Sequence, residues 1–197
     1  MNPNKEAFNT TLYFVRHAES VYVEGQERER GLTERGMLDA AKIADVLVQE
    51  RIRWFYSSPY RRAVDTLRVL AGHCGCEITM EEDLRERKLS GKDLGKENFR
   101  EAKQRVFLDP EFAFPGGESS VEAGKRAVAV LERILQQHAG EKVAIGTHGD
   151  IMTLMLNHYD PAYGYEFWES TSMPDIYKLE MDAERRLVGI ERLWVSS

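Results

Sequence analysis

The stretch Thr11-Leu12-Tyr13-Phe14-Val15-Arg16-His17-Ala18-Glu19-Ser20 carries a clear strand signal and the first candidate functional residues. Its first five residues are β-branched, aromatic or aliphatic, which is typical of a buried strand. The strand ends at Arg16 and His17, and His148 follows another apolar run, residues 143–145, in the same way. We expect both histidines at the carboxyl ends of strands, where ligands of open α/β sheets bind.

Helix signals alternate with strand signals in the first half of the chain. Thr33 is a candidate N-cap, and apolar residues recur after it with the period of an amphipathic helix. Residues 54–57 predict a second strand. Ser58 and Pro59 then combine a capping side chain with a proline suited to the first helical position, which predicts a helix start.

The second half continues the alternation. Ser119 or its neighbour can cap a long helix, and residues 151–156 predict a shorter one capped by Asp150. Residues 176–181 and 187–195 predict a hairpin that completes the sheet. The sequence therefore predicts an α/β fold, a three-layer α/β/α sandwich around a mostly parallel sheet with a C-terminal hairpin.

The composition and net charge of the chain limit the classes of partner that it is expected to bind. The 197 residues predict a single domain over residues 1–197, and the net charge of −6 argues against nucleic acid and membrane partners, which favour positive surface. A small anion can still bind in a local basic pocket. The two cysteines, Cys74 and Cys76, are poorly spaced for a disulfide, and the N-terminus Met1-Asn2-Pro3-Asn4-Lys5-Glu6 has no signal-peptide core. We expect a cytoplasmic protein of undetermined oligomeric state.

Four separate segments carry candidate residues of one chemical theme. They are Arg16 with His17, Arg62 at a helix start, Glu86 after Leu84, and His148. Each is ambiguous alone, because a strand-end histidine is more often a structural hydrogen-bonding group and a helix arginine is more often a solvated charge.

Six short motifs place these residues in order along the chain. They are Arg16-His17-Ala18-Glu19-Ser20, Leu32-Thr33-Glu34-Arg35-Gly36, the segment 57–66 with Arg62-Ala63, Leu84-Arg85-Glu86, Pro115-Gly116-Gly117-Glu118-Ser119, and His148-Gly149. Together they resemble the histidine phosphatase superfamily, specifically its phosphoglycerate mutase-like branch, over nearly the whole chain. By this resemblance Arg62, not Arg61, is the catalytic arginine.

The resemblance implies a phosphomonoester hydrolase that acts on a small phosphorylated metabolite. His17 is then the nucleophile that forms a phosphohistidine, Glu86 is the proton donor and acceptor, and Arg16, Arg62 and His148 bind the phosphoryl group. No metal or cofactor is expected. Chemistry alone leaves other donors open, and these are Glu19, Glu81, Glu82 and Asp83.

Several alternatives to a small-molecule phosphatase stay open. Residues 87–114, a short cap, leave little room for the long insertion of family mutases, so hydrolysis is favoured over a phosphoglycerate mutase-type phosphotransfer. A protein phosphohistidine phosphatase and a non-catalytic phosphate-binding module are the other candidates. Val23 stands where many members carry asparagine, and the charged run 24–30 is expected to be a solvated loop. Four aromatic residues either line a pocket for the leaving group or, as we favour, pack the cap: Phe99, Phe107, Phe112 and Phe114.

Overall fold

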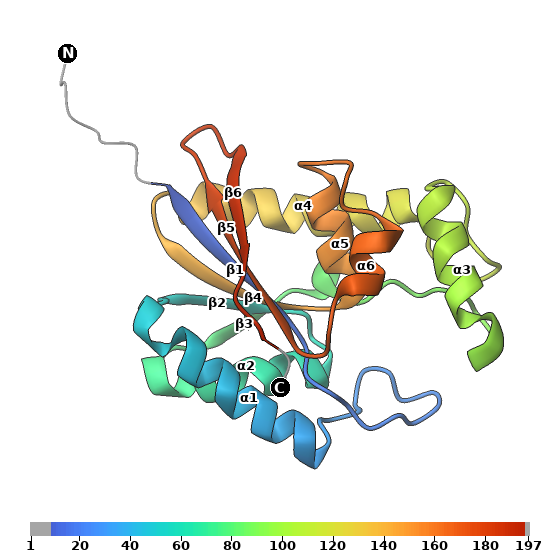
Figure 1. Ribbon diagram of the computed structural model, residues 1–197, viewed down its shortest axis with the longest axis horizontal. Coiled ribbons are helices and arrows are strands. Elements are labelled where there is room, and N and C mark those ends of the chain that lie inside the picture. Colours follow the sequence, from blue (N-terminus) through green and yellow to red (C-terminus); the bar gives the residue numbers. More distant parts are fainter. Residues whose placement is uncertain (1–8, 196–197) are drawn as a thin grey trace.

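One mixed sheet of six strands, in the order β3-β2-β4-β1-β5-β6, forms the centre of the part of the protein that the structure describes (Figure 1). The structure is a computed structural model, and it describes residues 9–195. The prediction from Met1-Asn2-Pro3-Asn4-Lys5-Glu6 therefore concerns residues outside this range. The strands are β1 (Thr10–Arg16), β2 (Trp54–Ser57), β3 (Ile78–Met80), β4 (Lys142–Thr147), β5 (Asp175–Met181) and β6 (Leu187–Arg192).

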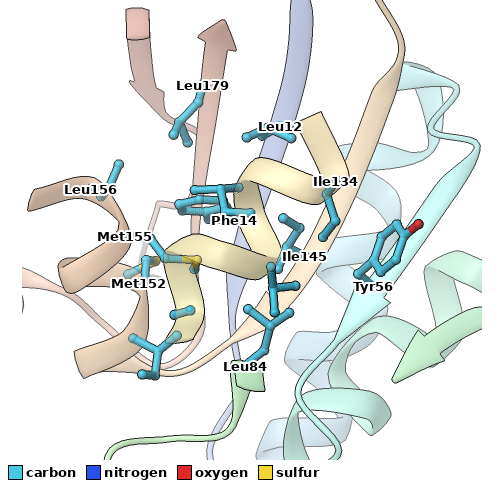
Figure 2. Packing of buried hydrophobic residues seen from close by; sticks show 14 of the residues in the cluster. Leu12, Phe14, Tyr56, Leu84, Ile134, Ile145, Met152, Met155, Leu156 and Leu179 are labelled. Carbon is cyan, nitrogen blue, oxygen red and sulfur yellow. The ribbon is translucent and has the colours of Figure 1, made fainter. Parts of the chain in front are cut away.

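The first four strands are parallel, and the last two close the sheet as an antiparallel hairpin. Side chains alternate along β1, so Leu12 and Phe14 join one buried cluster and Tyr13 and Val15 join the other. Figure 2 shows the first cluster, in which Phe14 lies beside Met155. Helices therefore cover both faces, and the predicted three-layer α/β/α fold is confirmed.

Helices α1 (Glu34–Leu47) and α2 (Arg61–Cys74) cover one face, and α4 (Ser120–Gln137) and α5 (Gly149–Asn157) cover the other (Figure 1). Thr33 caps α1 by accepting a hydrogen bond of 3.0 Å from Gly36 N, as predicted. Gly36 is required there, because a Cβ would lie 2.1 Å from the main-chain oxygen of Glu19. Ser119 caps α4 with a reciprocal contact from Glu122.

Two predicted helix starts are wrong, and both errors lie beside the histidines. Helix α2 begins at Arg61 rather than at Pro59, because the backbone of Tyr60 is extended (φ −66°, ψ 127°) and Tyr60 is the N-cap residue; the Ser58 hydroxyl contacts His148 and the amide of Tyr60. Helix α5 begins at Gly149 with His148 as its N-cap residue, and Asp150 lies inside the first turn. The Asp150 side chain is fully buried in ion pairs and therefore does not cap the helix.

The cap contains helix α3 (Lys96–Leu108), which packs against α6 (Tyr165–Ser170) at one end of the sheet (Figure 1). Strand β3 and helix α6 had no signal in the sequence that we recognised, and both are short. Two 3₁₀ turns, η1 (Val48–Glu50) and η2 (Glu82–Leu84), complete the elements of the described residues. Between residues 9 and 195, no helix combines the length and apolar character needed to cross a membrane.

Candidate active site

Strand register brings three of the predicted segments to one point of the sheet edge. Arg16 at the end of β1 pairs with Thr147 of β4, and Ser57 at the end of β2 pairs with Gly146. The residues that follow each strand, His17, Ser58 and His148, therefore emerge side by side. The His17 and His148 ring centroids lie 5.2 Å apart.

His17 is buried and has one ring nitrogen oriented for attack. Its Nδ1 lies 2.8 Å from the main-chain oxygen of Ala18, which accepts a hydrogen bond from Nδ1–H. Nε2 then carries the lone pair and accepts a hydrogen bond of 3.1 Å from Nε of Arg62. Burial and the neighbouring Arg62 hold the pKa of His17 well below its ordinary value. The imidazole is therefore neutral and nucleophilic near neutral pH.

Arg62 is a buried cation between His17 and the loop 21–31. Its Nη1 donates to the main-chain oxygen of Glu27 at 2.6 Å and lies 3.4 Å from the Glu27 carboxylate. Burial, with Arg30 nearby, lowers the pKa of Arg62 to about 10, so the group still carries its charge at neutral pH. The Arg62 guanidinium lies 5.0 Å from the centre of the Tyr60 ring. The loop that we expected to be merely solvated thus contacts a candidate phosphate ligand through Glu27.

His148 is fully buried and presents one nitrogen without a partner. Its Nε2 lies 2.7 Å from the Ser58 hydroxyl, and Nδ1 has no hydrogen-bond partner among residues 9–195. Burial and Arg62 hold the pKa of His148 well below its ordinary value. When Nε2 accepts a hydrogen bond from the Ser58 hydroxyl, the neutral ring carries its hydrogen on Nδ1, and this N–H is free to donate to an anion.

Thr171, the C-cap residue of helix α6, holds the Arg16 guanidinium in place. Its Nη1 donates to the main-chain oxygen of Thr171 at 3.3 Å and also to the Thr171 hydroxyl. Its Nε is buried and has no partner within the described part of the chain. Gly149 makes room for the guanidinium, because a Cβ would lie 3.0 Å from both its Cζ and Nη2. The glycine of the His-Gly motif is thereby explained by the close approach of Arg16.

Glu86 follows η2, and its carboxylate contacts the first turn of α5. Its carboxylate accepts hydrogen bonds from the amides of Arg87 (2.9 Å), Asp150 (3.2 Å) and Ile151 (3.2 Å). Burial, followed by the charge of Asp150, raises the pKa of Glu86 above its ordinary value, although the amides and Lys103 oppose this. A raised pKa favours the protonated form that a proton donor needs.

The other carboxylates that chemistry left open are engaged elsewhere. Glu19 accepts from Thr33 at 2.8 Å, Glu81 pairs with Arg133 at 2.8 Å, Glu82 pairs with Arg28, and Asp83 pairs with Arg85 at 3.1 Å. The structure thus brings Arg16, His17, Arg62, Glu86 and His148 together, whereas these alternative carboxylates bind other side chains.

A cavity of about 360 Å³ adjoins Arg16 on the side of the cap. Its lining residues are Arg16, Arg100, Trp168, Glu169 and Thr171. None of the four cap phenylalanines belongs to this lining. Phe107 packs against the core and Phe112 packs on Phe114 with centroids 4.9 Å apart, which agrees with the packing role that we favoured. Phe99 is half exposed beside Trp168.

Sequence reasoning missed several residues of this region. Tyr60 lies between His148 and Arg62, and the segment 57–66 already placed it two residues from the motif positions Ser58 and Arg62. Asp150 follows the His-Gly motif directly, but we assigned it a capping role. Lys103 and Trp168 had no usable signal, because only the packing of α3 and α6 brings them near the strand ends. Residues 9–195 contain no group of three or more His, Cys, Asp or Glu side chains arranged to hold a metal ion.

Comparison with known proteins places the chain in a family. The family model for the histidine phosphatase superfamily (branch 1) matches residues 12–188. A metal-independent phosphoserine phosphatase from Arabidopsis thaliana is 34% identical over 157 residues, which span 73% of this chain and 66% of that protein. Phosphoglycerate mutase-like protein 4 of the same organism is 30% identical over 170 residues, or 77% of this chain and 71% of that protein.

The fold also matches solved structures. The structure of a mycobacterial glucosyl-3-phosphoglycerate phosphatase superposes with a TM-score of 0.76 at 20% identity, covering 96% of this chain and 100% of that one. At this identity the likeness shows the fold alone.

Proposed function

The chain belongs to the histidine phosphatase superfamily, and from this premise we propose that it is a metal-independent phosphomonoester hydrolase that acts through a phosphohistidine on His17. The observation that carries the proposal is the hydrogen-bond pattern of His17. Its Nδ1 faces the Ala18 oxygen, and its Nε2 faces Arg62 at 3.1 Å, so a neutral nucleophilic nitrogen lies beside a cation. This is the arrangement that in-line attack on a phosphoryl group requires.

In the first half-reaction, Nε2 of His17 attacks phosphorus and the ester P–O bond breaks. Protonated Glu86 donates its proton to the leaving alkoxide, which departs as an alcohol. In the second half-reaction, ionised Glu86 takes a proton from water, whose oxygen attacks phosphorus while the N–P bond breaks. His17 regains its lone pair, and inorganic phosphate is the product.

The remaining residues bind the phosphoryl oxygens. Arg62 and Arg16 supply planar guanidinium donors, and the free Nδ1–H of His148 supplies a third group. Negative charge builds on the equatorial oxygens in the transition state, and fixed donors in a buried site stabilise it most effectively. Substrate phosphate displaces Glu27 from Arg62, since both anions require the same nitrogen.

Hydrolysis rather than phosphotransfer is supported by the short cap. Residues 87–114 form one helix and flanking loops, and the cavity beside Arg16 stays open past Arg100 and Glu169, whose side chains are 73% and 38% exposed. A mutase must retain its product and exclude water, which an open site does poorly. The phosphoserine phosphatase relative makes O-phosphoserine the first substrate to test.

The proposal is tested with purified protein in EDTA on a panel of O-phosphoserine, sugar phosphates, phosphoglycerates, nucleotides and a phosphohistidine peptide. We expect phosphate release from at least one small monoester and a loss on the order of 10⁴-fold or more in His17→Ala. Acid quench of labelled substrate should trap an adduct that survives alkali and is lost in acid. Activity retained in His17→Ala, or an alkali-labile adduct, would contradict the mechanism, and binding without turnover would favour a phosphate-binding module.

A further inference from the structure

A buried charge network lies directly behind Glu86, and the proposed mechanism does not use it. Asp150 Oδ2 accepts from Nε of Arg87 at 2.7 Å and from Nζ of Lys103 at 2.6 Å. The side chains of Arg87 and Asp150 are 0% exposed, and that of Lys103 is 6% exposed. The three residues come from the segment after Glu86, from α5 and from the cap helix α3.

The Glu86 carboxylate and Asp150 meet at the first turn of α5, to which Asp150 belongs. The amide of Asp150 donates to the Glu86 carboxylate, which places the two carboxyl groups in one buried region. Two carboxylates so placed do not both ionise at low cost. Asp150 has two cationic partners, whereas no Lys or Arg nitrogen in residues 9–195 lies within 4.0 Å of the Glu86 carboxylate. The proton shared between the two sites therefore belongs on Glu86.

The surroundings shift the pKa values of the two carboxyl groups in opposite directions. Burial alone would raise the pKa of Asp150, but Lys103 and Arg87 outweigh it and hold that pKa below its ordinary value. Burial raises the pKa of Glu86, and the Asp150 charge raises it further. Asp150 Oδ1 has no hydrogen-bond partner among the described residues, and both cations contact Oδ2. Such separated pairs are typical of acid–base sites.

Glu86 faces charged or titratable groups from all of the elements around it. They are Asp150 of α5, Lys103 of α3, Arg16 of β1, Arg62 of α2, Tyr60 before α2, and Arg126 of α4, which donates to the main-chain oxygen of Glu86. The cations in this set favour an ionised Glu86. Asp150 supplies the negative charge that opposes them.

We propose that Asp150 is a positioning residue that keeps the proton on Glu86, with Arg87 and Lys103 holding Asp150 in its ionised form. The inference rests on the proposed function only in naming Glu86 as the proton donor. A retained proton matters most for esters of aliphatic alcohols, whose alkoxides leave poorly without protonation. The site is thereby suited to alkyl phosphates.

The first test measures the proton on Glu86 directly. The side-chain carboxyl carbon of Glu86 is titrated by ¹³C NMR in the wild-type protein, in Asp150→Asn and in Lys103→Met, with Glu86→Gln used for assignment. We expect Asp150→Asn to lower the Glu86 midpoint by about one pH unit, because an anion is removed and two cations stay. Lys103→Met should raise it, because Arg87 still holds Asp150 ionised while one cation is lost. Opposite shifts are a signature that a loss of packing does not produce.

The second test measures turnover against pH with O-phosphoserine and with 4-nitrophenyl phosphate. In Asp150→Asn the alkaline limb of kcat should move to lower pH by about one unit for O-phosphoserine, while the aryl ester, whose leaving group needs little protonation, should change far less. Because each substrate is used with every variant, its own ionisation affects all the pH profiles equally and does not contribute to the difference between variants.

Asp39→Asn is the matched control. Asp39 is also a buried helix carboxylate with one lysine and one arginine partner, Lys42 at 3.2 Å and Arg35 at 3.7 Å, but it lies on α1. This variant should leave the Glu86 titration and both pH profiles unchanged.

Two results would overturn the inference. One is an unchanged Glu86 titration in both variants. The other is loss of activity at every pH in Asp150→Asn with the Glu86 midpoint unmoved, which would make Asp150 itself the proton donor. If Asp150→Asn does not fold, Lys103→Met decides. The NMR titration needs no turnover, so an inactive protein contradicts the proposed function without affecting this test.

Discussion

The two walls of the site are built in different ways. The phosphoryl wall consists of Arg16, His17, Arg62 and His148, and the sheet register fixes most of it, since three of the four residues end or follow a strand. The leaving-group wall consists of Glu86, Asp150, Lys103, Arg100 and Trp168, and it comes from a loop and from helices that pack over the sheet edge. The first wall holds neutral imidazoles among arginines, and the second holds carboxyl groups and a lysine.

Because of this difference, we expect the phosphoryl wall to affect the turnover of all substrates and the leaving-group wall to affect the choice among them. Every phosphomonoester presents the same phosphoryl group to the first wall, so a change there should affect all substrates alike. Leaving groups differ, so a change in the second wall should affect substrates unequally. The comparison can be tested by substitutions on each side.

The largest effect is expected from Arg62→Ala in the phosphoryl wall. Loss of its donors should lower kcat/KM by about 10²–10³-fold for every substrate, because these donors act on transition-state charge common to all of them. Steady-state kinetics on the substrate panel measures this. Arg61→Ala is the control, because Arg61 is exposed and its side chain forms an ion pair with Asp65 alone among residues 9–195, so the rates of this variant should stay near wild type. A strongly substrate-dependent loss in Arg62→Ala would remove the distinction between the walls.

A medium effect is expected on stability as the pH falls. The pKa values of His17 and His148 are lowered by burial, so below about pH 6.5 the unfolded chain binds protons that the folded chain does not. The free energy of unfolding should therefore decrease as pH falls from about 6.5 toward the folded pKa, by up to about 1.4 kcal/mol per pH unit for each histidine.

Urea denaturation of the wild-type protein, His17→Gln and His148→Gln between pH 7.5 and 5.5 measures this slope. Each variant should show a shallower pH dependence than wild type. Glu86, whose raised pKa acts in the opposite direction, is common to all three proteins and cancels in the difference. Identical slopes would mean that the histidines are protonated in the folded state.

The smallest effect is expected from Arg100→Met in the leaving-group wall. Arg100 lies on the rim of the cavity beside Arg16 and pairs with Glu169, so it should interact with carboxylate-bearing leaving groups only. We expect KM for O-phosphoserine or phosphoglycerate to rise a few-fold, roughly in line with one exposed charge contact, and KM for an uncharged aryl ester to stay the same. An equal change for both substrate types would show that the cavity does not select the leaving group.

The sequence alone predicted the sheet apart from β3, and it predicted the residues that we propose for the phosphoryl wall. Apolar runs of the strands, the Thr33 and Ser119 caps and the hairpin are local signals, and local physics decides them. His17 and His148 could be placed because strand ends are readable and parallel strands end on the same edge. Glu86 could be chosen among the nearby carboxylates only through the family resemblance.

Tertiary structure decided the rest. Ser58 and Asp150 both have side chains suited to a helix cap, but each binds a partner distant in sequence. The Ser58 hydroxyl contacts His148 as well as the amide of Tyr60, and the Asp150 carboxylate binds Arg87 and Lys103. No local pattern predicts such a choice, because a capping bond contributes only about 1 kcal/mol and the competing partners lie far away in the sequence. Sequence thus determined the strand ends that carry the proposed phosphoryl-binding residues, and packing of the helices determined which charged groups surround Glu86.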